Sequence, residues 1–267
     1  MSRPFAAFIF LGVGLTLTLQ ATAQRTNPPK TNREITPSKQ VVEGGTTPIK
    51  VLLLPSWGVT TGWEDLKTQW PKYGSAPIVI DDSTYISSSF TYTDLVKLNP
   101  DVIVLSDPAG GVMQYSLDEM SAVQRYASDG HTVIGTFAVF QWNTTDNRGL
   151  MPVFGLNPKL VYSATATISN LFVQVTSQSC LLTNLQSSWY SDGYPFTQSP
   201  ATAAQTWTHS ALGLATVVAQ SDNLKGIVSV YNGGTYEGIF ISNYPEFNGH
   251  TFDLQLLYNA VTCYAKK

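Results

Sequence analysis

The sequence has few residues that bind metals and few that carry charge. It contains only two cysteines and three histidines among 267 residues, and neither a CxxC pair nor a cysteine–histidine cluster occurs. No zinc site is predicted from such a composition. No GxGxxG motif follows an expected strand, so no nucleotide phosphate loop is predicted either. We therefore predict no metal and no cofactor.

The charge balance argues against nucleic acid as a partner. Charged residues make up 12% of the chain, and from Pro48 onward 10 Lys and Arg stand against 16 Asp and Glu, a balance of −6. Nucleic-acid-binding domains carry a basic stripe. The same acidic balance disfavours adsorption to anionic lipid.

The N-terminal segment has the pattern of a secretory signal peptide, residues 1–23. Arg3 gives a positive start, residues 5–19 form an apolar run, and Ala21-Thr22-Ala23 is a small-residue cleavage signal before Gln24. A membrane anchor is the alternative, but the run is short for a bilayer. No later stretch is long and apolar enough to be a membrane span, so a secreted, extracellular protein is predicted.

Two further segments follow the predicted cleavage site. Residues 24–48 are polar, rich in Pro and Thr and without periodicity, which is typical of a flexible leader. Residues 49–267 are of a length suited to a single α/β domain.

The two cysteines favour a disulfide between Cys180 and Cys263, since the count is even and the chain is predicted to be secreted. Closing a loop of this size would remove about 4–5 kcal/mol of chain entropy from the denatured state. Two buried free thiols are the alternative. Asn143 begins the single glycosylation sequon, Asn143-Thr144-Thr145, which would mark a surface loop.

Strand and helix patterns alternate four times in the first part of the domain. Short runs that are apolar on both faces predict buried parallel strands at 50–54, 77–80, 102–105 and 131–137. Helical periodicity predicts helices at 61–70 and 93–98, and a third helix that begins with the capping box Ser116-Leu117-Asp118-Glu119. This order predicts βαβ crossovers, a mostly parallel sheet and helices on both faces.

The pattern changes after Phe140. A loop with a short helix near 150–154 is expected, and then a segment rich in Ser, Thr, Gln and aromatics with alternating stretches such as 172–175. Residues 227–231 and 236–242 flank a glycine-rich turn and predict an antiparallel hairpin. A last helix is predicted at 251–264. The fold class is therefore α/β, doubly wound, with an added hairpin.

The order of these pieces resembles the class I glutamine amidotransferase-like fold, which is flavodoxin-like in its sheet, and within it the ThuA-like, trehalose-utilisation branch. Four segments carry the resemblance: KVLLLPSWG, LNPDVIVLSDPAGG, YSLDEMSAVQRYASDGHTVIGTF and VYNGGTYEGIFISNYPEFNGHTFDLQLLYNAVTCYA. Asn232-Gly233-Gly234 and Asn259-Ala260 occupy the places of that branch's turn and helix end. The resemblance covers residues 49 to 264.

The resemblance implies that amidotransferase chemistry is absent. In amidotransferases a cysteine follows a strand in a tight turn, and His-Pro-Glu follows a later strand. Here Phe137 and its successors follow the strand without a cysteine, and Tyr244 occupies the histidine place in Tyr244-Pro245-Glu246. A phenol with a pKa near 10 is a poor base at neutral pH. The same residues also fit an ordinary proline turn.

Polar and aromatic residues follow the predicted strands, where a doubly wound sheet binds its ligands. Such a rim suits a sugar or another polar small molecule, because carboxylates accept from hydroxyls and rings stack on C–H surfaces. The predicted ligand-binding residues are Ser56, Trp57, Asp82, Trp142 and Tyr244. If catalysis occurs, Glu246 and His250 are the predicted acid/base pair, with Asp107 orienting them.

Each of these residues also has a structural interpretation. The two tryptophans suit packing, Asp107-Pro108 suits a turn, and Asp81-Asp82 suits a cap. His250 suits a helix N-terminus. A divalent ion held by Asp81, Asp82 and Asp107 is a weaker further hypothesis.

Two classes of function fit the sequence. The first is a secreted, non-catalytic module that binds a glycan or a protein partner, favoured by the missing nucleophile, the low charge and the Ser/Thr/aromatic-rich segment. The second is a secreted enzyme acting on a sugar or polyol, which the ThuA-like resemblance implies.

Overall fold

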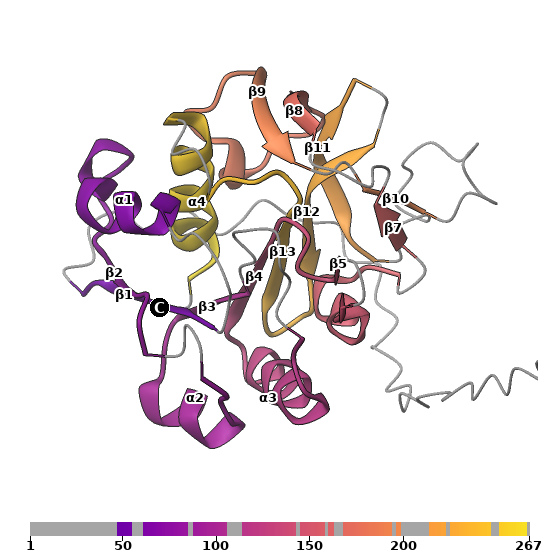
Figure 1. Cartoon of the computed structure of the whole chain (residues 1–267). Coiled ribbons are helices and arrows are strands. Elements are labelled where there is room, and N and C mark those ends of the chain that lie inside the picture. The colour runs from indigo at the N-terminus through magenta and orange to yellow at the C-terminus, as the bar shows by residue number, and fades with distance from the viewer. Residues whose placement is uncertain are drawn as a thin grey trace, which may run out of the picture. The chain divides into compact units, whose positions relative to one another are not determined.

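A mixed β-sheet with helices on both faces organises the chain (Figure 1). The computed structural model describes residues 47–54, 61–84, 88–105, 114–142, 145–157, 160–162, 168–193, 196–198, 214–222, 225–246 and 251–265. All of these residues belong to one unit of the chain.

Five parallel strands form one half of the sheet, in the order β2-β1-β3-β4-β13. They are β1 (Ile49–Leu53), β2 (Ile78–Asp81), β3 (Val102–Leu105), β4 (Thr132–Thr136) and β13 (Glu237–Ile241). Leu53 lies beside Val104, which lies beside Ile134 on the next strand. The four predicted strands and their parallel arrangement are therefore confirmed.

The other half of the sheet is antiparallel and larger than the single hairpin that the sequence predicts. From β13 it continues through β12 (Gly226–Asn232), β11 (Thr216–Ser221), β8 (Ile168–Val175) and β9 (Ser188–Gly193). Two short strands, β7 (Leu160–Tyr162) and β10 (Phe196–Gln198), join at β12. A separate two-stranded sheet pairs β5 (Gln141–Trp142) with β6 (Thr145–Asp146). The predicted hairpin is the β12–β13 pair.

Helices cover both faces of the parallel half, as a doubly wound fold requires (Figure 1). On one face lie α1 (Thr61–Gln69) and α4 (Thr251–Tyr264), and on the other lie α2 (Tyr92–Leu98) and α3 (Leu117–Ser128). Three 3₁₀ segments, η1 (Trp70–Lys72), η2 (Arg148–Phe154) and η3 (Cys180–Leu182), complete the element order. The α/β fold class is confirmed.

The continuous apolar character of the parallel strands follows from this arrangement. Along β1, Val51 and Leu53 pack into the core beneath α1 and α4, whereas Leu52 and Leu54 pack into the core beneath α2 and α3. Alternate side chains point to opposite faces, so a strand covered on both faces needs apolar residues at every position. Each fully buried side chain of this size stabilises the fold by about 1.5–3 kcal/mol.

The predicted start of α3 is confirmed. The Ser116 hydroxyl accepts from the Glu119 N–H at 3.2 Å, and the Glu119 carboxylate accepts from the Ser116 N–H at 2.8 Å. This reciprocal pair satisfies two backbone donors that a helix start leaves without an intrahelical partner.

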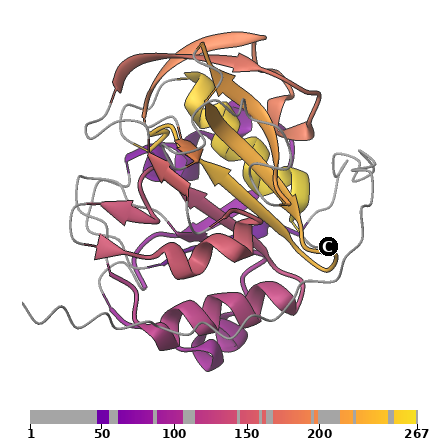
Figure 2. The same cartoon turned by 90° about the vertical axis from the view of Figure 1, so that its right-hand side faces the viewer.

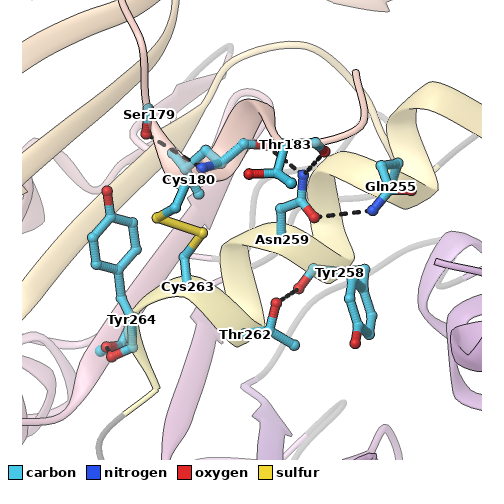
Figure 3. Close-up of a disulfide and its surroundings, with 11 residues drawn as sticks. Ser179, Cys180, Thr183, Gln255, Tyr258, Asn259, Thr262, Cys263 and Tyr264 are labelled. Carbon is cyan, nitrogen blue, oxygen red and sulfur yellow. Dashed lines mark hydrogen bonds between the residues drawn. A yellow bond between two sulfur atoms is a disulfide. The ribbon is translucent and has the colours of Figure 1, made fainter. Parts of the chain in front are cut away.

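Helix α4 ties the antiparallel half of the sheet to the parallel half (Figure 3). Cys263 near its end forms a disulfide with Cys180 of η3, the segment between β8 and β9, with Cα atoms 5.8 Å apart. The Asn259 amide donates to the carbonyl oxygens of Leu181 and Thr183 at 2.7 and 2.8 Å. The disulfide prediction is confirmed, and buried side-chain amides reinforce the covalent link.

Removing the disulfide should destabilise the fold without changing it. We expect Cys180→Ser with Cys263→Ser to lower the free energy of unfolding by about 2–5 kcal/mol, because the denatured chain regains the entropy of an open 83-residue loop. Urea unfolding followed by far-UV circular dichroism measures this change. A loss below about 0.5 kcal/mol would contradict this expectation and show that noncovalent contacts, among them those of Asn259 and Leu181, suffice to hold η3 against α4.

Candidate functional site

The carboxyl ends of β4 and β13 form the part of the predicted site that the structure describes. Ser56, Trp57, Asp107, Asn143 and His250 lie outside the described residues. Trp142 lies in β5, paired with Thr145 of β6, but its side chain is not described. The arrangement is therefore built from Asp82, Tyr244, Glu246 and the residues around them.

A tight turn with an unusual backbone conformation follows β4. Phe137, the first residue after the strand, has φ of +50°, in the left-handed region that bulky residues rarely adopt. Its N–H donates to the Ile241 carbonyl at the end of β13, at 2.8 Å. Its ring stacks on that of Tyr244, with centroids 4.0 Å apart and planes at 15°. Both rings are buried, so the turn is packed as part of the core.

The Glu246 side chain is fully buried where three elements meet. One carboxylate oxygen accepts from the Thr136 hydroxyl at the end of β4 and from the Trp63 indole N–H of α1, the latter at 3.4 Å. The Glu246 carbonyl also accepts from the Gly62 N–H at 2.8 Å. A carboxylate in an apolar environment needs such donors, because burying it without them costs several kcal/mol.

Gly62 allows α1 to approach this segment closely. A Cβ atom at this position would lie 2.6 Å from the Pro245 carbonyl oxygen and 2.8 Å from the Glu246 Cα. Backbone atoms do not move aside as a flexible side chain does, so a glycine is needed here. The start of α1 and the residues after β13 are therefore fitted to each other.

A second buried carboxyl group, Asp253, lies in the first turn of α4. The Ser191 hydroxyl of β9 is 3.0 Å from both of its oxygens, and the Asn243 amide donates to one of them at 2.9 Å. The Asn243 amide also donates to the Ser191 hydroxyl at 3.0 Å. This cluster joins the end of β13, the edge strand β9 and the start of α4.

Burial dominates the ionisation of Asp253. It raises the pKa of this carboxyl group to about 7, with further increases from the charges of Glu246 and Asp192, while the Ser191 hydrogen bond acts in the opposite direction. Two buried carboxyl groups thus influence each other beneath the carboxyl end of β13. Groups that titrate near neutrality occur both at catalytic sites and in structural networks.

Asp82 makes its described contacts with α1 and not with this cluster. Its two carboxylate oxygens accept from the Lys67 ammonium at 3.0 and 3.2 Å. The neighbouring Asp81 accepts from the backbone N–H groups of Ser83 and Thr84 at 3.2 and 3.0 Å, which is a local turn after β2. The capping interpretation therefore fits Asp81, whereas Asp82 forms an ion pair with α1, and its predicted role in ligand binding stays a prediction.

Sequence reasoning missed four residues of this arrangement: Thr136, Trp63, Ser191 and Asp253. From the sequence, Thr136 is only part of a predicted strand and Trp63 only part of an apolar helix stripe. Ser191 lies in a polar segment, and Asp253 lies at a predicted helix start. Asp253 has a usable signal, since it stands among apolar residues in the first turn of a helix. The contacts of the other three depend on pairing between elements distant in sequence, which periodicity does not indicate.

Two further hypotheses from the sequence concern a bound metal ion and a membrane span. Within the ranges that the structure describes, no group of three or more His, Cys, Asp or Glu side chains could hold a metal ion. No helix in the same ranges combines the length and apolarity needed to span a bilayer.

Comparison with known proteins supports the fold. No protein-family model and no curated protein match the sequence. Among solved structures, one assigned as part of a GMP synthase from Thermoplasma acidophilum matches with a TM-score of 0.51 at 15% identity, covering 82% of this chain and 95% of its own. A ThuA-like protein from Bacteroides uniformis matches with a TM-score of 0.50 at 18% identity, covering 80% and 91%.

A cytoplasmic protein from Salmonella typhimurium LT2 matches with a TM-score of 0.56 at 11% identity, covering 81% of this chain and all of its own. The chain has a ThuA-like, class I glutamine amidotransferase-like fold. At these identities the likeness concerns the fold alone, and the chemistry of the domain depends on its own residues.

The ionisation of Asp253 should make the stability of this domain depend on pH. Its pKa of about 7 in the folded state lies above the ordinary value of about 3.9, so the folded state holds a proton that the unfolded state has lost between these values. Stability is then lost as the pH rises from about 4 to about 7, by on the order of a few kcal/mol.

Asp253→Asn should flatten this dependence, because the amide mimics the protonated carboxyl group at every pH. Urea midpoints measured from pH 4 to pH 8 test this, with Asp222→Asn, a change at an exposed turn, as the control. Parallel pH profiles for the wild type and Asp253→Asn would contradict the assignment.

Proposed function

We propose that this chain is a secreted, non-catalytic binding domain that keeps an amidotransferase-like fold without amidotransferase activity. The observation that carries the proposal is the buried stack of Phe137 on Tyr244, at a centroid distance of 4.0 Å. The stack bears on two requirements of the amidotransferase reaction.

The first requirement is a nucleophile at the turn after β4. An amidotransferase presents a cysteine thiolate there, which attacks the substrate amide. In this chain Phe137 occupies that turn with φ of +50°, and a phenyl ring has no nucleophilic atom. A left-handed conformation costs a bulky residue on the order of 1–3 kcal/mol. The stack on Tyr244 and the hydrogen bond to Ile241 help to stabilise it.

The second requirement is a base oriented by a carboxylate. Tyr244 occupies the histidine place, and a phenol ionises near pH 10, too high for a base at neutral pH. Glu246 accepts hydrogen bonds from Thr136 and Trp63 and is fully buried. Its contacts support a structural role that fastens β4, α1 and the end of β13 together.

The compartment is part of the same proposal. Disulfides persist in oxidising compartments, and the Cys180–Cys263 bond supports secretion through the predicted signal peptide.

The ligand would be a glycan or another polar molecule, because the predicted rim is rich in aromatic, amide and hydroxyl groups.

An enzyme acting on a sugar or polyol is the second candidate. One observation favours it: Asp253 has a pKa of about 7 and is influenced by the charge of Glu246, which is the electrostatic pattern of a proton-transferring pair. Against it stands the burial of both carboxyl groups, since each is no more than 1% exposed. We therefore place the binding function first.

A glutaminase assay tests the proposal directly. We expect the purified mature chain to release no glutamate from glutamine above the buffer rate, because Phe137 and Tyr244 stand in the places of the nucleophile and the base, while a cysteine-dependent amidotransferase run alongside does so. Incubation with trehalose, other disaccharides and sugar alcohols, followed by chromatography, should likewise return each compound unchanged.

Two results would overturn the proposal. Glutamate release by the wild type that Glu246→Gln abolishes and Glu237→Gln retains would restore amidotransferase chemistry. Conversion of a sugar or polyol that Asp253→Asn abolishes would favour the second candidate.

A further inference from the structure

The antiparallel half of the sheet has an outward face lined by aromatic and amide side chains. Phe172 of β8 lies directly beside Tyr190 of β9. Two residues further along β8, Gln174 lies beside Ser188 of β9 on one side and Gln220 of β11 on the other. We call these five residues the outer row: Phe172, Gln174, Ser188, Tyr190 and Gln220.

The alternation of side chains along the strands separates this face from the core. Leu171, Val173 and Trp189 are buried in the same core as α4. Their neighbours Phe172 and Tyr190 point to the opposite face, since successive side chains alternate. Figure 2 shows β8 and β9 as an outer layer with α4 beneath them.

Tyr190 is the most exposed member of the outer row that carries a large apolar surface. It is 63% exposed, although it lies in the middle of a strand. Phe172 is half-buried, and its ring lies 5.5 Å from that of Tyr190 at an angle of 62°. An edge contact of this kind orients a ring and leaves surface available for a further contact. Phe172 therefore holds Tyr190 in place at the surface.

A single exposed tyrosine is common on protein surfaces, so the side chains around Tyr190 decide whether a ligand fits there. Gln174 lies on the diagonal from Tyr190, at about 7 Å between neighbouring rows. Two glutamines and a serine together offer both donors and acceptors, as hydroxyl groups require. No Lys or Arg occurs in β8, β9 or β11. A nucleic acid or an anionic glycan finds no counter-charge on these strands.

We propose that the outer row binds a neutral glycan, with the C–H face of one pyranose ring stacked on Tyr190. The hydroxyl groups of that sugar or of the next one would be bound by Gln174, Ser188 and Gln220. The inference deepens the proposed function, on which it rests, by naming the ligand class and a surface distinct from the carboxyl ends of β4 and β13.

Binding to defined oligosaccharides tests this inference on the full mature chain. The probes are hexamers of β-1,4-glucose, β-1,3-glucose, β-1,4-xylose, β-1,4-mannose and β-1,4-N-acetylglucosamine, titrated by calorimetry. We expect at least one to bind the wild type. Tyr190→Ala should weaken that binding about ten-fold, the loss expected from one stacking contact.

Matched variants separate stacking from general damage to the fold. Tyr190→Phe keeps the ring and should bind within about two-fold of the wild type, whereas Gln174→Ala should weaken binding about three- to ten-fold by removing hydrogen bonds to hydroxyls. Leu117→Ala removes an exposed apolar residue from α3, on another part of the domain, and should bind as the wild type does.

The outcomes distinguish this inference from the proposed function. Binding of none of the five hexamers, or binding that Tyr190→Ala leaves unchanged in a folded protein, overturns the glycan inference and leaves the absence of amidotransferase activity to its own assay. Binding that Tyr190→Ala weakens supports the inference. If chromatography then shows that the bound sugar is converted, the proposed non-catalytic function fails while the glycan surface stands.

Discussion

The packing of Phe137, Tyr244 and Glu246 at the carboxyl ends of β4 and β13 is the constraint on which the proposed function depends. In a doubly wound fold this edge is where ligands bind. Here the Phe137–Tyr244 stack fills the turn after β4, and Glu246 is bound by Thr136 and Trp63 within the core. The side chains in the places of an amidotransferase's catalytic groups are buried here, and the proposed absence of amidotransferase activity is inferred from that burial.

A second consequence concerns the antiparallel half of the sheet. Its outer strands β8 and β9 depend on α4 through the Cys180–Cys263 bond, the Asn259 amide and the Asp253–Ser191 contacts. Helix α4 therefore packs against residues of both halves of the sheet within the same core. This arrangement keeps the outward face of β8 and β9 available at the surface, where the proposed glycan contact lies.

The parallel half could be predicted well from the sequence because its central strands β3 and β4 are buried along their whole length, and such strands are uninterrupted apolar runs. Little of the antiparallel half could be predicted, since β8 pairs with β11 some 45 residues later and neither strand has a regular alternation of apolar and polar residues along its whole length. The Tyr-Pro-Glu motif draws attention to Glu246 in the sequence, but the burial of Glu246 could not be predicted. Its hydrogen-bond donors, Thr136 and Trp63, come from elements far apart in sequence. The positive φ of Phe137 leaves no trace in residue type at all.

Hydrogen–deuterium exchange of the mature chain tests most directly whether the segments at the carboxyl ends of β4 and β13 are packed as core. If residues 136–140 and 241–246 are packed as core, their backbone amides should exchange about as slowly as those of β3, because they open only with large-scale unfolding. Exchange of these two segments within seconds, while β3 remains protected, would describe an open and mobile site. That result would contradict the packing of Phe137, Tyr244 and Glu246 on which the proposed function depends.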